Sequence, residues 1–528
     1  MVADAAPLPR IHPSVHRALE KQGSADIIVT LKQTPAAAIA SVQEADFDSR
    51  GAKIEALVGR LEQLATESQS ALNAVLAQES APAAPLYQEK TSFWISNQVF
   101  IKGASHELVQ RLSALPSLSE VREQLILPLP APIHQEDTGN STSTGVLANE
   151  WGITKIGAPS VWASGNTGQK VVVSTIDTGV LYTHEALKNN FRSSHGWFDP
   201  FKKTTTPTDE NGHGTHTMGT IAGSGGIGVA PGAKWIACRG CTTEGCTEAD
   251  LLSCAQFITC PTDADGKNKD CAFAPHVVSN SWGGGQGDTF YKAAVDTWVA
   301  AGIIPVFANG NEGPECGTAN SPGDYENVIA VGATDSNDAL ASFSSKGPAK
   351  SGLLKPEVSA PGSSVRSSWN SGPTSYKSIS GTSMACPHVS GIVALLLNAN
   401  PGLKFADVKK ILTSTTDTKT LQPAGKTCGS ISDDTFPNSS FGYGRVNAQK
   451  AVNAAGSSPA PVPTSPTPST APTPAPSSAA PPPRPSPAPS TVAPTPAPGA
   501  CATLGYFECT KSPSCTWDWS SFSCAKKA

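Results

Sequence analysis

The chain carries few charged side chains and no long apolar run. Over 528 residues it has 38 lysines and arginines against 43 aspartates and glutamates, a formal net charge of −5. Proteins that bind nucleic acid usually display a stripe of basic side chains, which this sequence lacks. A membrane-spanning helix needs about 20 consecutive, mostly apolar residues, and these are also missing. We therefore expect a soluble protein that binds neither nucleic acid nor a membrane.

The first 20 residues lack the apolar core of a signal peptide. Two other features nevertheless indicate secretion. The 13 cysteines, most of them clustered, exceed what a reducing cytosol usually keeps, and Asn140 and Asn438 each begin a glycosylation sequon. Because these features outweigh the missing signal, we expect a secreted, extracellular glycoprotein with disulfide bonds.

Segment 20–128 alternates strand and helix patterns. In chain order the apolar residues predict a strand at 27–31, one long amphipathic helix over 54–76, neighbouring strands at 93–95 and 99–101, a helix over 108–115 and an extended stretch from 121 to 129. This order fits an open β-α-β-β-α-β layout, and the alternative is an unspecific small α+β domain. Residues 129–150 are rich in Pro, Ser, Thr and Gly, which predicts an exposed joint open to proteolysis.

Segment 151–455 shows a different pattern, with short continuous apolar runs at 171–176, 277–279, 303–307 and 328–331. Such runs are typical of strands buried on both faces. They predict an α/β domain with a mainly parallel sheet covered by helices. Functional groups in these sheets gather at the carboxyl ends of the strands. Asp177 directly follows the first run, so we expect it at that edge.

Two segments complete the chain. Residues 456–500 are dense in Pro, Ala, Ser and Thr, which predicts an extended linker without a core. Segment 501–528 is too short to fold without staples, and it contains Cys501, Cys509, Cys515 and Cys524. We therefore expect a small disulfide-rich module at the C-terminus.

Three short segments carry residues suited to nucleophilic catalysis. Ser383 lies in Gly-Thr-Ser-Met-Ala-Cys-Pro-His (381–388), ahead of an apolar run, so we expect it at the start of a buried helix with Pro387 in the first turn. Unpaired N–H groups at a helix start favour negative charge beside the serine. Alone, this motif is also consistent with a simple helix cap.

Asp177 and His213 supply the other groups that such a serine needs. Asp177 lies in Ser-Thr-Ile-Asp-Thr-Gly-Val (174–180) and His213 in Asn-Gly-His-Gly-Thr-His-Thr (211–217). A serine hydroxyl needs a neutral imidazole to take its proton as it attacks. The imidazole needs a carboxylate to fix its tautomer and stabilise its charged form.

The three segments and their order, Asp then His then Ser, resemble the subtilisin (subtilase) family of serine endopeptidases, and segment 151–455 is most similar to its bacillopeptidase-like secreted members. By this resemblance Asp177 orients the imidazole, His213 is general base and then general acid, and Ser383 attacks the scissile carbonyl. The family pattern assigns catalysis to the first histidine of the pair, so His216 is expected to be structural.

The resemblance also implies an oxyanion and substrate site. Segment 309–313, Asn-Gly-Asn-Glu-Gly, resembles the family's oxyanion segment, in which the asparagine before Glu-Gly donates a side-chain amide. That residue is Asn311. Asn309 and Gly310 are expected on the substrate-facing loop, and the alternative for Asn309 is that it only satisfies backbone groups of the turn.

Another segment, made of Ser281, Trp282, Gly283 and Gly284, resembles the strand of the family that pairs with the substrate backbone. Glycine lets another chain approach closely in such a strand. Trp282 is bulky for this setting. It either lines a subsite or covers the edge of the core.

Subtilases commonly carry a prodomain that assists folding and then blocks the cleft. The resemblance therefore implies that residues 20–128 are an intramolecular inhibitor, with residues 123–129 lying in the active site like a substrate and the joint at 129–150 being processed. The loop after His213 lacks the Asn-bearing segment of the strong calcium site in bacterial subtilisins. We expect no metal and no cofactor, because a solvated loop explains Asp263, Asp265 and Asp270 better than a weak cation site.

Nine cysteines lie in the catalytic segment, so one stays unpaired within it. Six lie in one insertion and are expected to pair among themselves. Cys316 and Cys428 resemble a pair found in related secreted subtilases. This leaves Cys386, on the helix of Ser383, as a small apolar residue.

The expected function is a secreted endopeptidase that acts on proteins or peptides. Two other functions remain open at this point: binding of a surface or carbohydrate through the C-terminal module, and serine esterase activity. The module contains Tyr506, Phe507, Trp517, Trp519 and Phe522, more aromatic surface than so small a core can hide. We expect it either to bind an insoluble polysaccharide or to be a cap without a ligand.

Overall fold

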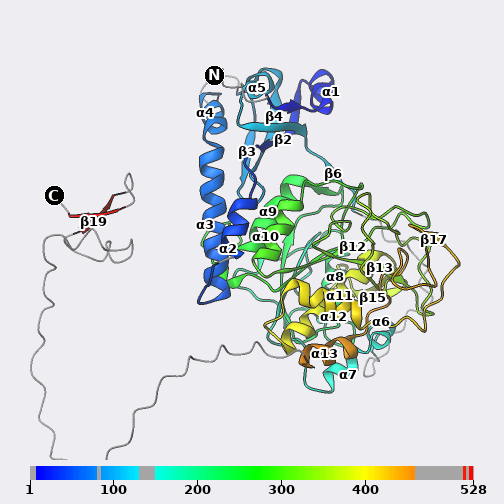
Figure 1. Cartoon of the computed structure of the whole chain (residues 1–528). Helices are drawn as coiled ribbons and strands as arrows, with labels where there is room; N and C mark the ends of the chain where they lie inside the picture. The colour runs from blue at the N-terminus through cyan, green and yellow to red at the C-terminus, as the bar shows by residue number, and fades with distance from the viewer. Residues whose placement is uncertain are drawn as a thin grey trace, which may run out of the picture. The chain divides into compact units, whose positions relative to one another are not determined.

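The computed structural model describes residues 8–43, 45–79, 85–129, 149–457, 515–518 and 523–526. The chain divides into two compact units, Met1–Ala460 and Pro461–Ala528. In the first unit we call residues 8–129 the N-terminal lobe and residues 149–457 the main lobe (Figure 1).

The N-terminal lobe is a five-stranded sheet with helices packed on it. Its strand order is β1-β5-β2-β4-β3. The strands are β1 (Arg10–Ile11), β2 (Ser24–Leu31), β3 (Glu89–Phe93), β4 (Gln98–Ser105) and β5 (Leu118–Glu123), and the helices are α1 (Pro13–Gln22), α2 (Ala36–Gln43), α3 (Arg50–Ser68), α4 (Ser70–Glu79) and α5 (His106–Leu112). The predicted neighbouring strands do pair, as β3 with β4.

Three details of this lobe differ from the sequence expectation. The lobe begins with β1 and α1, before residue 20. The single long helix is two helices, because the chain breaks at Gln69, whose buried side chain bonds Asn97 and Ser92 instead of facing solvent. The strand expected at 93–95 ends at Phe93.

The main lobe contains a seven-stranded sheet in which every pairing is parallel, as predicted. Its order is β14-β13-β12-β11-β7-β9-β8. The strands are β7 (Val172–Asp177), β8 (Trp197–Phe198), β9 (Lys234–Arg239), β11 (Val277–Asn280), β12 (Ile304–Ala308), β13 (Ile329–Thr334) and β14 (Val358–Pro361). The mainly parallel α/β fold expected from the continuous apolar runs is confirmed.

Helices cover both faces of this sheet. The helices are α6 (Trp151–Lys155), α7 (Ala158–Trp162), α8 (His213–Ala222), α9 (Glu248–Thr259), α10 (Lys292–Ala300), α11 (Thr382–Ala399), α12 (Phe405–Ser414), α13 (Ala448–Ser457) and the 3-10 turn η1 (Cys271–Phe273). Successive strand residues enter different cores: Val277 packs with α8 and α11, and Val278 packs with α9 and α10. This alternation explains why the strands are apolar throughout.

Helix α11 forms the centre of one core. Among the described residues it is the one helix long and apolar enough to cross a membrane, but 89% of it is buried inside the fold. It is therefore a core helix of the main lobe.

Short strand pairs and disulfides fasten the loops. β6 (Ile126–Leu127) pairs with β10 (Cys246–Thr247), β15 (Val365–Ser368) with β16 (Tyr376–Ile379), and β17 (Thr427–Cys428) with β18 (Ile431–Ser432). The disulfides are Cys238–Cys254, Cys241–Cys246, Cys260–Cys271 and Cys316–Cys428. Cys386 is buried and free, so the expected arrangement of all nine cysteines is confirmed.

In the second unit the described residues form a hairpin of β19 (Cys515–Asp518) and β20 (Ser523–Lys526). The expectations for the linker, for the remaining cysteines of the module and for its aromatic side chains lie outside the described residues.

Asn438 does not suit the glycosylation inferred from its sequon. Its side chain is 0% exposed. Its Nδ2 donates to the carbonyls of Asp433 and Thr435, and its Oδ1 accepts from the N–H groups of Ser440 and Phe441. The residue holds a turn together, and a glycan on Nδ2 would require that turn to open. Asn140 lies outside the described residues.

Candidate active site

Asp177 is the last residue of β7, a central strand of the parallel sheet. Its Oδ1 lies 2.8 Å from Nδ1 of His213 and accepts the N–H of Thr178 at 2.8 Å. Its Oδ2 accepts the hydroxyl of Thr217 at 3.2 Å. The sheet thus brings a buried carboxylate to the imidazole at its carboxyl edge, where the sequence placed it.

His213 is the first residue of α8 and follows Gly212, whose φ of 101° favours glycine. Asp209 fastens this helix start, because its carboxylate accepts the N–H groups of Asn211, Gly212 and Thr215. Burial lowers the pKa of His213, but the charge and hydrogen bond of Asp177, helped by Asp209, outweigh it and raise the pKa above its usual value of 6.5. The carboxylate therefore stabilises the protonated imidazole.

Ser383 is the second residue of α11, which begins at Thr382 directly after Gly381. The sequence predicted Pro387 in the first turn of this helix, but the residue lies inside the helix instead. Since proline has no N–H, the carbonyl of Ser383 lacks its usual donor four residues on. The hydroxyl of Ser281 replaces that donor at 2.9 Å, and the hydroxyl of Ser383 donates to the carbonyl of Ser281 at 3.2 Å.

The hydrogen bond between Ser383 and His213 is not formed in this structure. Nε2 of His213 is buried and has no partner among the described residues, while the hydroxyl of Ser383 is turned to Ser281. His213 and Ser383 lie at the starts of α8 and α11, and these two helices pack directly on each other. Catalytic hydrogen bonds are often loose before substrate binds, so this geometry is compatible with a serine–imidazole pair.

Asn311 is placed beside the start of α11. Its Oδ1 accepts the N–H and the hydroxyl of Thr382, both at 2.8 Å. These bonds turn the amide so that its Nδ2 faces Gly381. A Cβ built on Gly381 would lie 3.4 Å from this Nδ2 and 3.6 Å from the backbone nitrogen of Ser383, so the two nitrogens flank the same point. Within the described chain neither nitrogen has an acceptor, so both are available to an oxyanion beside Ser383.

Asn309 and Gly310 support the loop instead of facing the cleft. Asn309 is buried, and its Nδ2 donates to the carbonyl of Ser345 at 2.6 Å. Gly310 has a φ of 108°, and a side chain there would collide with Glu312 and Ser345. For Asn309 the structure thus favours the alternative reading, a residue that satisfies backbone groups of the turn.

A segment of the N-terminal lobe lies along the main lobe as an extended chain. β6 pairs antiparallel with β10, with Leu127 opposite Cys246 and Ile126 opposite Thr247. A Cβ on Gly284 would stand 3.0 Å from the Leu127 side chain. Gly284, the last residue of the segment expected to pair with substrate, is therefore the glycine that lies against this chain. β10 was not singled out from the sequence.

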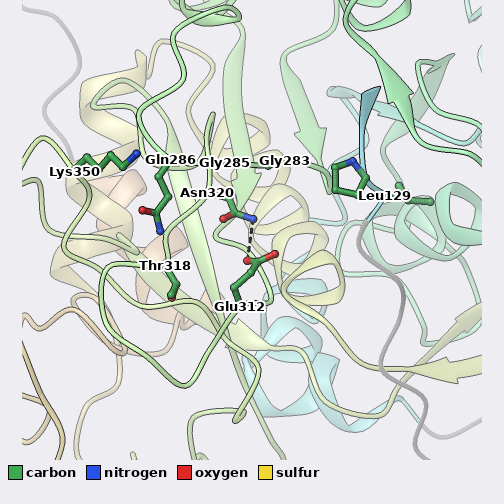
Figure 2. Close-up of a pocket in the computed structure, with 10 residues that line it drawn as sticks. Leu129, Gly283, Gly285, Gln286, Glu312, Thr318, Asn320 and Lys350 are labelled. Atoms are coloured by element: carbon green, nitrogen blue, oxygen red, sulfur yellow. Dashed lines mark hydrogen bonds between the residues drawn. The ribbon is translucent and has the colours of Figure 1, made fainter. Parts of the chain in front are cut away.

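Beyond β6 the chain reaches a cavity of about 690 Å³ (Figure 2). Its lining residues are Pro128, Leu129, Gly283, Gly284, Gly285, Gln286, Glu312, Thr318, Asn320 and Lys350. The carboxylate of Glu312 accepts the amide of Asn320 and the hydroxyl of Ser345, both at 2.9 Å. Its position is therefore fixed at the cavity wall.

Trp282 does not line this cavity. Its side chain is 1% exposed, and its ring packs edge-on against Tyr291 and Phe307 at centroid distances of 5.1 and 5.5 Å. The structure thus selects the second interpretation of Trp282, a residue of the core.

Polar contacts fix the N-terminal lobe on α9 and η1. Arg122 makes a bidentate ion pair with Glu248 at the start of α9, at 2.6 and 2.8 Å. The same carboxylate accepts the N–H of Leu125 at 2.9 Å. Burial raises the pKa of Glu248, although Arg122 and the Leu125 N–H oppose this effect. Arg50 donates to the carbonyls of Ala274 and Pro275.

The second histidine and the acidic loop take structural places. His216 is buried with Nε2 at 2.9 Å from the carbonyl of Val365, and burial lowers its pKa to about 3. Asp263 and Asp265 bond neighbours in their own turn, and Asp270 caps η1. In the described part of the chain no group of three or more His, Cys, Asp or Glu side chains could hold a metal ion.

A parallel sheet that presents a buried Asp–His pair, with a serine at the start of a core helix and two free donors beside it, defines a serine hydrolase scaffold. Residues 168–444 match the subtilase family. The chain belongs to this family.

Individual relatives agree with the family match. The chain is 38% identical to Bacillopeptidase F of Bacillus subtilis (strain 168) over 394 residues, which cover 69% of this chain and 26% of that protein. It is 39% identical to Subtilisin DY of Bacillus licheniformis over 273 residues, 50% of this chain and 90% of that protein. Serine protease AprX of Bacillus subtilis (strain 168) is 35% identical over 324 residues, 54% of this chain and 67% of that protein. The family expected from the three motifs is confirmed.

Proposed function

We propose that the protein is a secreted serine endopeptidase that hydrolyses peptide bonds through an acyl-enzyme intermediate. The buried Asp177–His213 pair carries the proposal, because a carboxylate 2.8 Å from Nδ1 fixes the tautomer that leaves Nε2 free to accept a proton. The names of the relatives, which include a serine protease and alkaline proteases, support the same class of activity.

In the proposed reaction, His213 Nε2 takes the proton of Ser383 while Oγ attacks the scissile carbonyl. The hydroxyl of Ser383 must first break its hydrogen bond to the carbonyl of Ser281 and turn toward His213. Substrate binding would favour this change, because catalytic hydrogen bonds tighten when the site closes on the substrate. The amide of Asn311 and the N–H of Ser383 stabilise the oxyanion. His213 then gives its proton to the leaving amine, and water releases the acyl group from Ser383 by the same path in reverse.

The contact between β6 and β10 supports a polypeptide substrate over a small ester. An edge strand that pairs with backbone N–H and C=O groups recognises an extended chain independently of its side chains. Gly284 leaves room for that chain, and the cavity beside Gly283 accepts one side chain from it.

We also propose that the N-terminal lobe is an inhibitory prodomain. Residues 126–129 occupy the proposed substrate path, and Arg122 anchors them through Glu248. The chain after Leu129 is the proposed processing joint. Self-processing by Ser383 would remove the lobe and open the edge of β10.

The four disulfides of the main lobe support an oxidising, extracellular location. For the C-terminal module we propose anchoring to an insoluble polysaccharide. Truncation after Gly456 should leave hydrolysis of small soluble peptides nearly intact and reduce retention on chitin or cellulose. Equal retention of both forms would exclude anchoring to these polymers.

The test of the main proposal is a comparison of Ser383→Ala with the unchanged chain. The unchanged chain should remove its N-terminal lobe and hydrolyse casein, while the variant should do neither. Casein hydrolysis or normal maturation by purified variant, free of other proteases, would contradict the proposal. Hydrolysis of short esters without hydrolysis of casein would favour an esterase.

A further inference from the structure

The strand that pairs with the extended chain is short, and its second residue, Thr247, caps α9 by accepting the N–H of Asp250. β10 is Cys246–Thr247, and its sheet contains only one other strand, β6. Once the N-terminal lobe leaves, β10 keeps no strand partner among the described residues. A two-residue strand without a partner has no hydrogen-bond ladder to define its position, so other contacts must do so.

A disulfide supplies one of these contacts. Cys246, the first residue of β10, is bonded to Cys241, and both side chains are at most 1% exposed. The bond closes the turn 242–245, in which the N–H of Thr242 donates to the carbonyl of Gly245 at 2.8 Å. The turn that leads into β10 is therefore fixed at both ends.

The other end of this disulfide is attached to the catalytic strand. The N–H groups of Gly240 and Cys241 donate to the backbone carbonyl of Asp177 at 3.0 and 3.1 Å. One covalent bond thus separates β10 from residues that are hydrogen-bonded to Asp177. The position of the extended chain is coupled by this route to the position of the Asp177–His213 pair.

The closed turn also touches the extended chain directly. Gly245 has a φ of 129°, and a Cβ there would stand 2.7 Å from the carbonyl oxygen of Leu127. Past the turn, the N–H of Glu248 donates to the carbonyl of Leu125 at 3.3 Å. The bound chain therefore runs along the segment that begins at the disulfide.

We propose that the Cys241–Cys246 disulfide is a positioning element for extended polypeptide substrates: it holds β10 where residues on the N-terminal side of the scissile bond can pair with it. This inference depends on the proposed endopeptidase function, since it takes β6 to mark the path of a substrate. The disulfide does not touch the reacting atoms. It acts through β10, so its effect depends on the length of the substrate.

The test uses the mature enzyme with both cysteines replaced, Cys241→Ala together with Cys246→Ala. Alanine avoids burying an unpaired hydroxyl. The control pair, Cys260→Ala with Cys271→Ala, removes another disulfide of the same insertion, which joins the end of α9 to η1 and not to β10. KM and kcat are measured per titrated active site on a pentapeptide anilide and on an ester of a single acylated amino acid.

The ratio of the pentapeptide KM to the ester KM should rise about tenfold in the Cys241/Cys246 variant, since a strand held loosely loses on the order of one or two backbone hydrogen bonds to the substrate. It should stay the same in the control pair. An unchanged ratio in the first variant, or an equal rise in both, would overturn the inference.

A second variant keeps the proposal testable if the first does not fold. Gly245→Ala leaves the disulfide intact and places a methyl group against the path of the extended chain. It should raise the same KM ratio, and an unchanged ratio would show that substrates do not pair with β10. If the unchanged enzyme cleaves neither substrate nor casein, the endopeptidase function itself fails, which distinguishes that result from a failure of this inference.

Discussion

Nδ1 of His213 lies 2.8 Å from Oδ1 of Asp177, and neither side chain is more than 2% exposed. Burial alone would lower the pKa of the imidazole, but the Asp177 carboxylate raises it above 6.5. A general base must be neutral, so kcat/KM should be lost as the pH falls through this raised pKa and should be full above it.

Replacing Asp177 by Asn removes the charge that raises the pKa of His213. The acidic limb of the kcat/KM profile should then move to lower pH, and kcat should fall about 10⁴-fold because the tautomer is no longer fixed. Profiles of both forms on one peptide anilide check this. A limb that stays in place would show that another group controls it.

Asn311 is expected to act only in the transition state. Asn311→Leu should lower kcat by about 10²- to 10³-fold with little change in KM, the cost of losing one such donor in a relative of this protein. Leucine also removes the acceptor that Oδ1 provides for Thr382. Asn311→Asp is the matched variant, because it keeps this acceptor while it replaces the donor by a carboxylate oxygen, whose negative charge should lower kcat further. A rise in KM alone in both variants would indicate a binding role instead.

Arg122 should determine how tightly the N-terminal lobe inhibits. Arg122→Ala leaves the buried Glu248 carboxylate without its ion pair, so inhibition of the mature enzyme by an added lobe should weaken about 30-fold or more, equivalent to about 2 kcal/mol. The control is Arg111→Ala, which removes an exposed pair with Glu107 inside α5. Inhibition constants that change equally in the two variants would show that Arg122 has no special part in docking.

Cys386 should behave as a core residue and not as a reactive thiol. It is buried three residues after Ser383, and burial raises its pKa to about 11, which leaves almost no thiolate at neutral pH. Labelling of the native main lobe by a thiol reagent should be slow, and denaturation should expose one equivalent in that lobe. Rapid labelling of the native protein, or a mapped disulfide at Cys386, would contradict this.

Local sequence patterns predicted the features of the site that depend on neighbouring residues. Asp177 was placed correctly because it directly follows a continuous apolar run, and such a run in a parallel sheet ends at the functional edge. Ser383 was placed at a helix start for a similar reason. The position of Pro387 was wrong by one turn, because the small residues before it do not mark where the helix begins.

The remaining features depend on residues far apart in the chain. The mutual hydrogen bonds of Ser281 and Ser383 join two segments about 100 residues apart, and no local pattern announces them. β10 has two residues and pairs with a strand of another lobe, so neither its length nor its composition is a strand signal. The burial of Trp282 follows from packing on Tyr291 and Phe307, which a short motif cannot encode.

The central claim is that Ser383 is the nucleophile, and covalent labelling tests it most directly. Mature enzyme treated with diisopropyl fluorophosphate should gain one adduct, which peptide mapping should locate on Ser383, and casein hydrolysis should fall in proportion to labelling. Ser383→Ala should take up no adduct. Full casein hydrolysis by completely labelled enzyme, or an inactivating adduct on any other residue, would contradict the account.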